Sequence, residues 1–250
     1  MEFSLVTFSV LIVVGFLAGL ISAIAGSGGL IVLPTLLSVG MPPLQALATN
    51  KFQSVFGTLS STVNFFRKGH IDLKAMKVTL LCAFVGALVG TWAVQQLDTE
   101  LLKQGLPYFL LLLALYVWFS PRMSNHDTEP RCSERKFDLG VGGGIGFYGG
   151  FLGPGMGSFF AVAYSSLRGY NLKRATAHTK PLVLITNTTS MVIFVLAGKV
   201  FWSLAIPMAL AQVLGARIGS NLVINRGANL IKPVLVMVIV ILALKLIFFP

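Results

Sequence analysis

The feature that most constrains this chain is its series of long apolar runs, which begins with an uncharged stretch between Glu2 and Lys51. Only 11% of the 250 residues are charged and the mean hydropathy is +0.84, whereas a soluble domain usually has about 25% charged residues. Runs of about 20 apolar residues are long enough to cross the hydrocarbon core as helices. Such runs occur at about 4–39, 44–66, 77–97, 103–120, 139–167, 175–197, 200–222 and 230–249. The sequence therefore predicts an all-α, polytopic integral membrane protein that contacts the lipid bilayer.

Two of these runs, 4–39 and 139–167, are too long for a single crossing. Glycine interrupts both, at 26–29 (Gly-Ser-Gly-Gly) and at 153–157 (Gly-Pro-Gly-Met-Gly). Because glycine and proline favour breaks, we expect each run to form a broken or re-entrant helix or a tight helical hairpin. The first run follows no Lys or Arg and is too long for the apolar region of a signal peptide. We therefore expect it to belong to the mature protein.

The chain also repeats itself. A shift of 131 residues places Gly26-Ser27 on Gly157-Ser158, and a shift of 129 residues places Lys51 on Lys180. The second shift also pairs Ala48 with Ala177, Ser61 with Ser190, Gly86 with Gly215, and Gly90 with Gly219. Chance similarity between apolar runs does not easily align glycines and lysines in one register. The sequence therefore predicts two homologous transmembrane repeats, residues 1–120 and 139–250, joined by a linker at 121–138.

The basic loops indicate how the two halves are oriented. In the first half, loop 39–45 has no basic residue whereas loop 67–77 has several; in the second half, loop 168–174 is basic and turn 198–200 has only Lys199. Cytoplasmic loops carry an excess of Lys and Arg, so equivalent loops of the two halves face opposite sides. This predicts an inverted-topology repeat, an architecture common among secondary transporters. The linker is then cytoplasmic, and both termini are periplasmic in a bacterial inner membrane.

The acidic residues all lie at a terminus or in predicted loops: Glu2, Asp72, Asp98, Glu100, Asp127, Glu129, Glu134 and Asp138. Transporters of protons and cations usually place a carboxylate inside the membrane, so a metal cation is disfavoured as substrate. Cys82 and Cys132 have no paired or metal-ligand spacing, and we expect no metal site and no cofactor. The net charge of +11 follows from the basic loops, so nucleic acid is not an expected partner.

Two lysines lie inside predicted spans, at the equivalent positions Lys51 and Lys180. A charge within the membrane costs free energy unless it is compensated, and an anion between the halves would compensate both. Asn50 and Thr179 adjoin the lysines and are the preferred direct ligands. The alternative is that each lysine snorkels to its nearer interface, which does not explain their equivalence. His178 is the titratable side chain in a span that would couple protons near neutral pH.

The glycine breaks are a second candidate anion site. A helix that restarts after a break presents unpaired N–H groups and the positive end of its dipole. The candidate donors are Gly26, Ser27, Gly28, Gly155, Gly157 and Ser158. The alternative is that these glycines only permit tight packing. The motifs Gly86–Gly90 and Gly215–Gly219, each with small residues four positions apart, are expected to pack helices closely within each half.

Several motifs together resemble the TauE/SafE sulfite exporter family. They are Gly-Phe-Leu-Ala-Gly-Leu-Ile-Ser-Ala-Ile-Ala-Gly-Ser-Gly-Gly at 15–29 with the following Pro34, Ala-Thr-Asn-Lys at 48–51, and Gly-Phe-Tyr-Gly-Gly-Phe-Leu-Gly-Pro-Gly-Met-Gly at 146–157. The resemblance spans nearly the whole chain. It implies movement of sulfite, sulfoacetate and related organosulfur anions across the bacterial inner membrane. The matching positions are Gly26, Ser27, Gly28, Asn50, Lys51, Gly155, Gly157, Thr179 and Lys180.

These features predict a secondary transporter that exports a small anion such as sulfite or an organosulfonate. An inside-negative potential favours outward movement of an anion by about 2.3 kcal/mol per charge per 100 mV, so export needs no proton site. An anion channel and a carrier for small carboxylates stay open as alternatives. An intramembrane enzyme is remote, because no span supplies a nucleophile with a base, a metal cluster or paired carboxylates. Whether the protein forms a homodimer also stays open.

Overall fold

The computed structural model describes residues 3–98, 100 and 126–226, and these residues form helices and connecting turns without a strand. The helices are α1 (Leu5–Ala25), α2 (Gly29–Ser38), α3 (Pro43–Arg67), α4 (Lys77–Gln95), α6 (Glu134–Lys136), the π-helix η1 (Phe137–Gly142), α7 (Gly143–Phe151), α8 (Met156–Arg168), α9 (Leu172–Leu196) and α10 (Trp202–Arg226). The all-α prediction is confirmed for this part of the chain. The predicted spans 103–120 and 230–249 lie outside the described residues.

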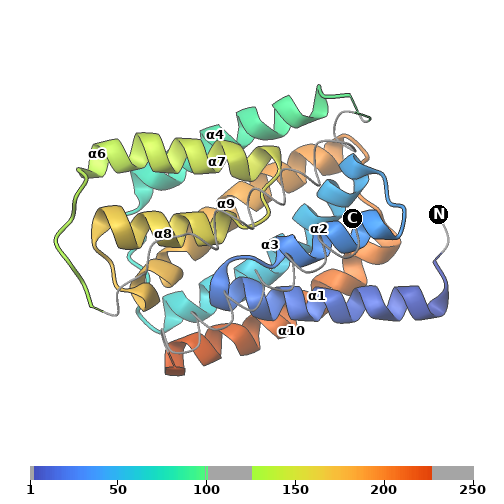
Figure 1. Ribbon diagram of the computed structural model, residues 1–250, viewed down its shortest axis with the longest axis horizontal. Helices are drawn as coiled ribbons and strands as arrows, with labels where there is room; N and C mark the ends of the chain where they lie inside the picture. Colours follow the sequence, from blue (N-terminus) through green and yellow to red (C-terminus); the bar gives the residue numbers. More distant parts are fainter. Residues whose placement is uncertain (1–2, 99, 101–125, 227–250) are drawn as a thin grey trace, which may run out of the picture.

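Both long apolar runs fold into helical hairpins, α1 with α2 and α7 with α8 (Figure 1). Gly26 ends α1 with a φ of +76°, and Gly155 precedes α8 with a φ of +78°. Glycine adopts this left-handed conformation without the steric cost that a Cβ would add. At the open end of the second hairpin, Arg168 donates to the Cys132 carbonyl (2.9 Å) and pairs with Glu134 (2.6 Å). The predicted interruptions are confirmed.

The helices form an elongated bundle with two outer layers and a polar centre. Figure 1 shows α4 and α7 along one long edge, α1 and α10 along the opposite edge, and the remaining long helices between them. α1 packs against α10, α4 packs against α7, and α3 packs against both α9 and α10. The core clusters therefore join elements from distant parts of the sequence.

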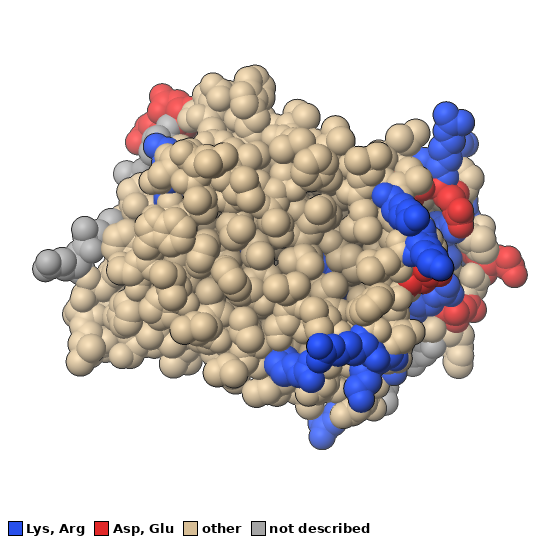
Figure 2. Space-filling model, turned by 180° about the vertical axis from the view of Figure 1, so that it is seen from behind, with Lys and Arg blue, Asp and Glu red and all other residues tan. Residues whose placement is uncertain are grey.

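The outer faces of the bundle are suited to contact lipid. Large apolar side chains are exposed on α10 at every fourth position: Trp202, Ile206, Leu210, Leu214 and Ile218. Such spacing marks one face of a helix. Among the described helices, α1, α4, α9 and α10 are long and apolar enough to cross a membrane. A broad surface with almost no charged side chains covers the middle of the molecule (Figure 2). The prediction of a polytopic membrane protein is confirmed.

The two inner helices, α3 and α9, carry most of the buried polar side chains. Each is 25 residues long, and their first and last residues are related by the 129-residue shift that pairs Lys51 with Lys180. The buried polar residues include Asn50, Lys51, Gln53, Thr58, Ser61 and Asn64 on α3 and Thr176, His178, Thr179, Lys180, Thr186, Asn187, Thr189 and Ser190 on α9. Polar groups inside an apolar bundle need partners, so this centre is the place to look for a site.

The glycine motifs of α4 and α10 join the two halves of the sequence. A Cβ on Gly86 would lie 2.6 Å from the backbone N of Phe147 on α7, and a Cβ on Gly215 would lie 2.9 Å from the backbone N of Leu20 on α1. The expectation of close packing within each half is therefore wrong, because the first helix of each hairpin lies against a helix of the other half. The inverted relation of the halves and the boundaries 1–120, 121–138 and 139–250 stay predictions.

Basic side chains gather toward one end of the molecule (Figure 2). The described part of the linker meets the α8–α9 junction at this end: the Thr128 N–H donates to the Gly169 carbonyl (2.7 Å), and Arg174 pairs with Asp127 (3.4 Å). α1 begins at the opposite end (Figure 1), where the ring of Phe3 contacts that of Phe201 with centroids 5.7 Å apart. The molecule is thus polarised in charge along its long axis.

Candidate functional site

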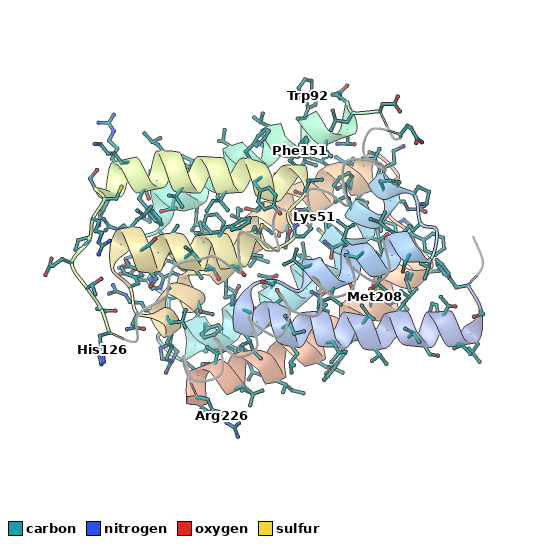
Figure 3. All side chains as sticks on the ribbon, in the orientation of Figure 1. Lys51, Trp92, His126, Phe151, Met208 and Arg226 are labelled. Carbon is teal, nitrogen blue, oxygen red and sulfur yellow. The ribbon has the colours of Figure 1, made fainter. Side chains whose placement is uncertain are left out.

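Lys51 lies deep in the bundle, near the middle of its long axis (Figure 3). Its side chain extends from α3, and the residue is 1% exposed. The ammonium donates to the carbonyl of Gly149 in the last turn of α7 and to Oδ1 of Asn187 on α9 (3.3 Å). Carbonyls in the last turn of a helix carry the negative end of the helix dipole. Within the described residues, the charge of Lys51 is therefore compensated by a helix terminus and one amide, and no carboxylate pairs with it.

Lys180 has the corresponding position on α9 and is 2% exposed. Its ammonium donates to the carbonyl of Ser22 (2.8 Å), which also accepts the N–H of Gly26 at the end of α1. Each lysine thus contacts the C-terminal turn of a hairpin helix that belongs to the other half. The snorkelling alternative disagrees with this geometry, since both ammonium groups are buried and bonded to interior carbonyls.

The two ammonium groups keep hydrogen-bonding capacity. An ammonium has three N–H donors, and within the described residues Lys51 uses two of them while Lys180 uses one. Buried donors without acceptors are costly, and an anion supplies acceptors together with the opposite charge. The arrangement can therefore hold a small oxyanion without any further cationic group.

The glycine breaks meet at the contact between the two hairpins. Ser27 Oγ lies 2.5 Å from Ser158 Oγ, and Ser158 donates to the Ala25 carbonyl (2.6 Å). A Cβ on Gly157 would lie only 2.7 Å from Gly26 Cα. The two hydroxyls thus hydrogen-bond within the protein, and these glycines allow the hairpin backbones to touch, as the packing alternative requires.

The other predicted glycines also lie at close contacts. A Cβ on Gly28 would lie 2.9 Å from Cβ of Ser22, where α2 turns back against α1. A Cβ on Gly155 would meet the side chain of Leu30 at 3.4 Å. The hairpin tips are therefore packed against each other and against the start of α2.

The residues beside the lysines have different surroundings. Asn50 accepts a long hydrogen bond from Gln53 (3.5 Å), and its Nδ2 would lie 3.3 Å from a Cβ on Gly29 at the start of α2. Thr179 donates to the carbonyl of Thr176 on its own helix (2.8 Å). Asn50 thus faces a hairpin tip, whereas the Thr179 hydroxyl is used within α9. That Asn50 and Thr179 bind substrate stays a prediction.

Asn187 contacts a lysine of the candidate site, although the sequence did not single it out as a ligand. It follows Lys180 by two helical turns, so the two side chains share a face of α9, yet Asn187 hydrogen-bonds Lys51. Thr58 has the same place relative to Lys51 on α3, and its buried Oγ1 has no hydrogen-bond partner in the described part of the chain. The spacing of seven residues after each lysine was the available signal.

His178 lies apart from the lysine ammonium groups, near the basic end of the bundle. It is 3% exposed, its Nδ1 is 2.9 Å from the Arg174 carbonyl, and its ring contacts those of Tyr164 and Tyr170. It lines a polar cavity of about 360 Å³ that neither Lys51 nor Lys180 lines. That His178 couples protons stays a prediction.

No cluster of three or more His, Cys, Asp or Glu side chains is present among the residues that the structure describes. Cys82 and Cys132 are both unpaired cysteines. The described carboxylates are exposed apart from that of Asp138, which is half-buried and accepts a hydrogen bond from the Thr79 hydroxyl (2.5 Å). Within these ranges, the buried ionic groups of the centre are therefore cationic.

The chain is similar to known proteins over nearly its whole length. The sequence matches the family described as sulfite exporter TauE/SafE over residues 11–246. The probable membrane transporter protein YfcA of Escherichia coli (strain K12) is 41% identical over 239 residues, which cover 96% of this chain and 89% of that protein. A probable membrane transporter protein of Haemophilus influenzae is 38% identical over 248 residues, which cover 99% and 97% of the two chains. No solved structure matches the chain.

Proposed function

Since the chain belongs to the sulfite exporter TauE/SafE family and is a membrane transporter, we propose that it carries a small oxyanion, such as sulfite or an organosulfonate, on Lys51 and Lys180. The observation that carries this proposal is the pair of buried ammonium groups, each of which has N–H donors without an acceptor in the described residues. Because no described carboxylate is buried beside them, an anion is the substrate that the interior accommodates with the least electrostatic cost.

The helix termini support binding that is reversible. Each ammonium already has a carbonyl acceptor when the site is empty, so the unliganded state does not leave an unpaired buried charge. An arriving oxyanion adds charge-assisted hydrogen bonds to the remaining N–H donors. A transporter needs this balance, because a substrate that binds too tightly does not leave on the other side.

The charge distribution supports an orientation and a direction of transport. The basic end carries loops 67–77 and 168–174, so it is cytoplasmic by the positive-inside rule. α1 then begins on the periplasmic side of a bacterial inner membrane. The membrane potential favours outward movement of an anion by about 2.3 kcal/mol per charge per 100 mV, so we propose export without a coupled proton.

The direct test is transport of labelled sulfite by the purified full-length protein in proteoliposomes. We expect efflux that an inside-negative potential accelerates, competition by organosulfonates, and weak competition by small carboxylates. We also expect labelled sulfite to exchange against unlabelled sulfite on the opposite side, since a carrier shows counterflow and a channel does not. Efflux no faster than from protein-free liposomes would refute the proposal, and efflux without counterflow would replace the carrier with an anion channel.

A further inference from the structure

The polar cavity that His178 lines, of about 360 Å³, opens at the basic end of the bundle. The loop between α3 and α4 contributes His70 and Asp72 to its lining, and the first two turns of α9 contribute Lys173, Arg174 and His178. The cavity therefore joins an element of the first half to an element of the second half. Its volume exceeds the roughly 30 Å³ that one water molecule occupies in the liquid, so it has room for a small hydrated ion.

The cations of this cavity are incompletely paired within the described residues. Lys173 has no hydrogen bond and no ion pair there. Arg174 lies 3.8 Å from the ring centroid of Tyr170 and makes a long contact of 3.4 Å with Asp127. His178 is 3% exposed and its Nδ1 is used by a backbone carbonyl, while its Nε2 has no hydrogen bond in the described part.

The single carboxylate in the lining, Asp72, is already engaged. Its Oδ1 accepts the backbone N–H groups of Lys74 (2.9 Å) and Ala75 (3.2 Å), which fold the loop before α4. Burial and the nearby charge of Lys173 lower the pKa of His70. The lining therefore has more positive than negative charge available to a guest.

We propose that this cavity is a cytoplasmic docking site in which a small oxyanion binds to Lys173 and His178 before it reaches Lys180. The inference rests on the proposed function, since it assigns the cytoplasmic entrance of the same transport route. His178 precedes Lys180 by two residues on α9, so the docking site and the central site share one helix. Basic clefts raise the local concentration of anions and so speed their capture.

The test compares Lys173→Gln with the control Lys68→Gln, which makes the same charge change at an exposed position of the same end that does not line the cavity. Uptake of labelled sulfite is measured in inside-out and right-side-out membrane vesicles. We expect Lys173→Gln to raise the apparent KM about fivefold in inside-out vesicles, as the loss of one exposed charge pair would. Maximal rate in inside-out vesicles should stay within twofold of the wild type, and Lys173→Arg should restore the KM.

Equal KM values for Lys173→Gln and Lys68→Gln in inside-out vesicles would overturn the docking site while leaving the central site intact. If the wild type moves no sulfite in either vesicle type, the proposed function fails, and calorimetric titration of the full-length protein with sulfite then decides the docking site. Fivefold weaker binding by Lys173→Gln than by Lys68→Gln supports it. Equal binding by the two variants contradicts it.

Discussion

Lys51 and Lys180 have equivalent positions on α3 and α9, but they are not equally provided with acceptors. Among the residues that the structure describes, Lys51 donates to a helix terminus and to Asn187, whereas Lys180 donates to a helix terminus alone. At the position of α3 equivalent to Asn187 stands Thr58, whose hydroxyl is buried without a partner in the described residues. A buried hydroxyl without a partner costs about 1–3 kcal/mol. The Lys51 ammonium therefore makes more hydrogen bonds to the protein, and the Lys180 ammonium has more N–H donors left for an anion.

The largest expected difference follows from removing each charge in turn. Lys180→Gln should weaken sulfite binding about 100-fold and Lys51→Gln about tenfold, since two free donors are lost in the first case and one in the second, each contributing about 1.5 kcal/mol. Isothermal titration of the purified protein measures both affinities. Lys199→Gln is the control, because it removes an exposed lysine in the turn between α9 and α10. Equal losses, or a larger loss at Lys51, would contradict the ranking.

A substitution that displaces the Lys51 ammonium should weaken sulfite binding as much as the loss of Lys51 itself. A Cβ on Gly153, where φ is +92°, would overlap the Lys51 ammonium and lie 3.2 Å from its Cε. We expect Gly153→Ala to weaken sulfite binding about tenfold, the value for one lost charged hydrogen bond. Gly40→Ala is the matched control, because Gly40 has a φ of +83° and no atom of the described residues lies within 4 Å of its added Cβ. Similar affinities for the two variants would show that the Lys51 side does not bind the anion.

Variants of Asn187 and Thr58 should distinguish an effect on protein stability from an effect on sulfite binding. Asn187→Ala should lower the melting temperature, because it removes an acceptor of a buried ammonium and interhelical hydrogen bonds contribute about 0.6–1.7 kcal/mol. Thr58→Val should leave the melting temperature unchanged or raise it, since the hydroxyl has no hydrogen-bond partner among the described residues. It should also weaken sulfite binding about fivefold. Thermal melts with and without sulfite measure both effects. A lower melting temperature with normal binding in Thr58→Val would make that hydroxyl structural.

The smallest effect on binding is expected at the hairpin tips. The Ser27 hydroxyl is hydrogen-bonded to Ser158, so Ser27→Ala should destabilise the protein by about 1 kcal/mol and change the affinity for sulfite less than twofold. The same titration and melts apply. A tenfold loss of affinity would instead place the tip hydroxyls at the anion, as the sequence predicts.

The parts that sequence reasoning predicted correctly depend on local composition. Long apolar runs and the glycines at 26–29 and 153–157 report helices and breaks directly, because membrane crossing requires internally satisfied backbone and glycine permits the sharp turn. The equivalent helix positions of Lys51 and Lys180 could also be predicted, since the same 129-residue shift relates the ends of α3 and α9. These signals do not depend on which helices become neighbours.

The hydrogen-bond acceptors of the two lysines could not be predicted from the sequence, because they depend on which helices become neighbours. Gly149 and Ser22 act through backbone carbonyls, which leave no side-chain signature. Their place beside the lysines follows from packing across the halves, α7 on α4 and α1 on α10. The incorrect assignment of the Gly86 and Gly215 motifs to packing within each half has the same origin, since small residues predict close approach but not the partner.

The central claim is that Lys51 and Lys180 together hold the transported anion. The most direct measurement is counterflow of labelled sulfite by the double variant Lys51→Gln/Lys180→Gln in proteoliposomes, beside the wild type and Lys199→Gln. We predict counterflow at the protein-free level for the double variant and normal counterflow for the control, with thermal melts confirming that all three proteins are folded. Near-normal counterflow in a folded double variant would contradict the claim.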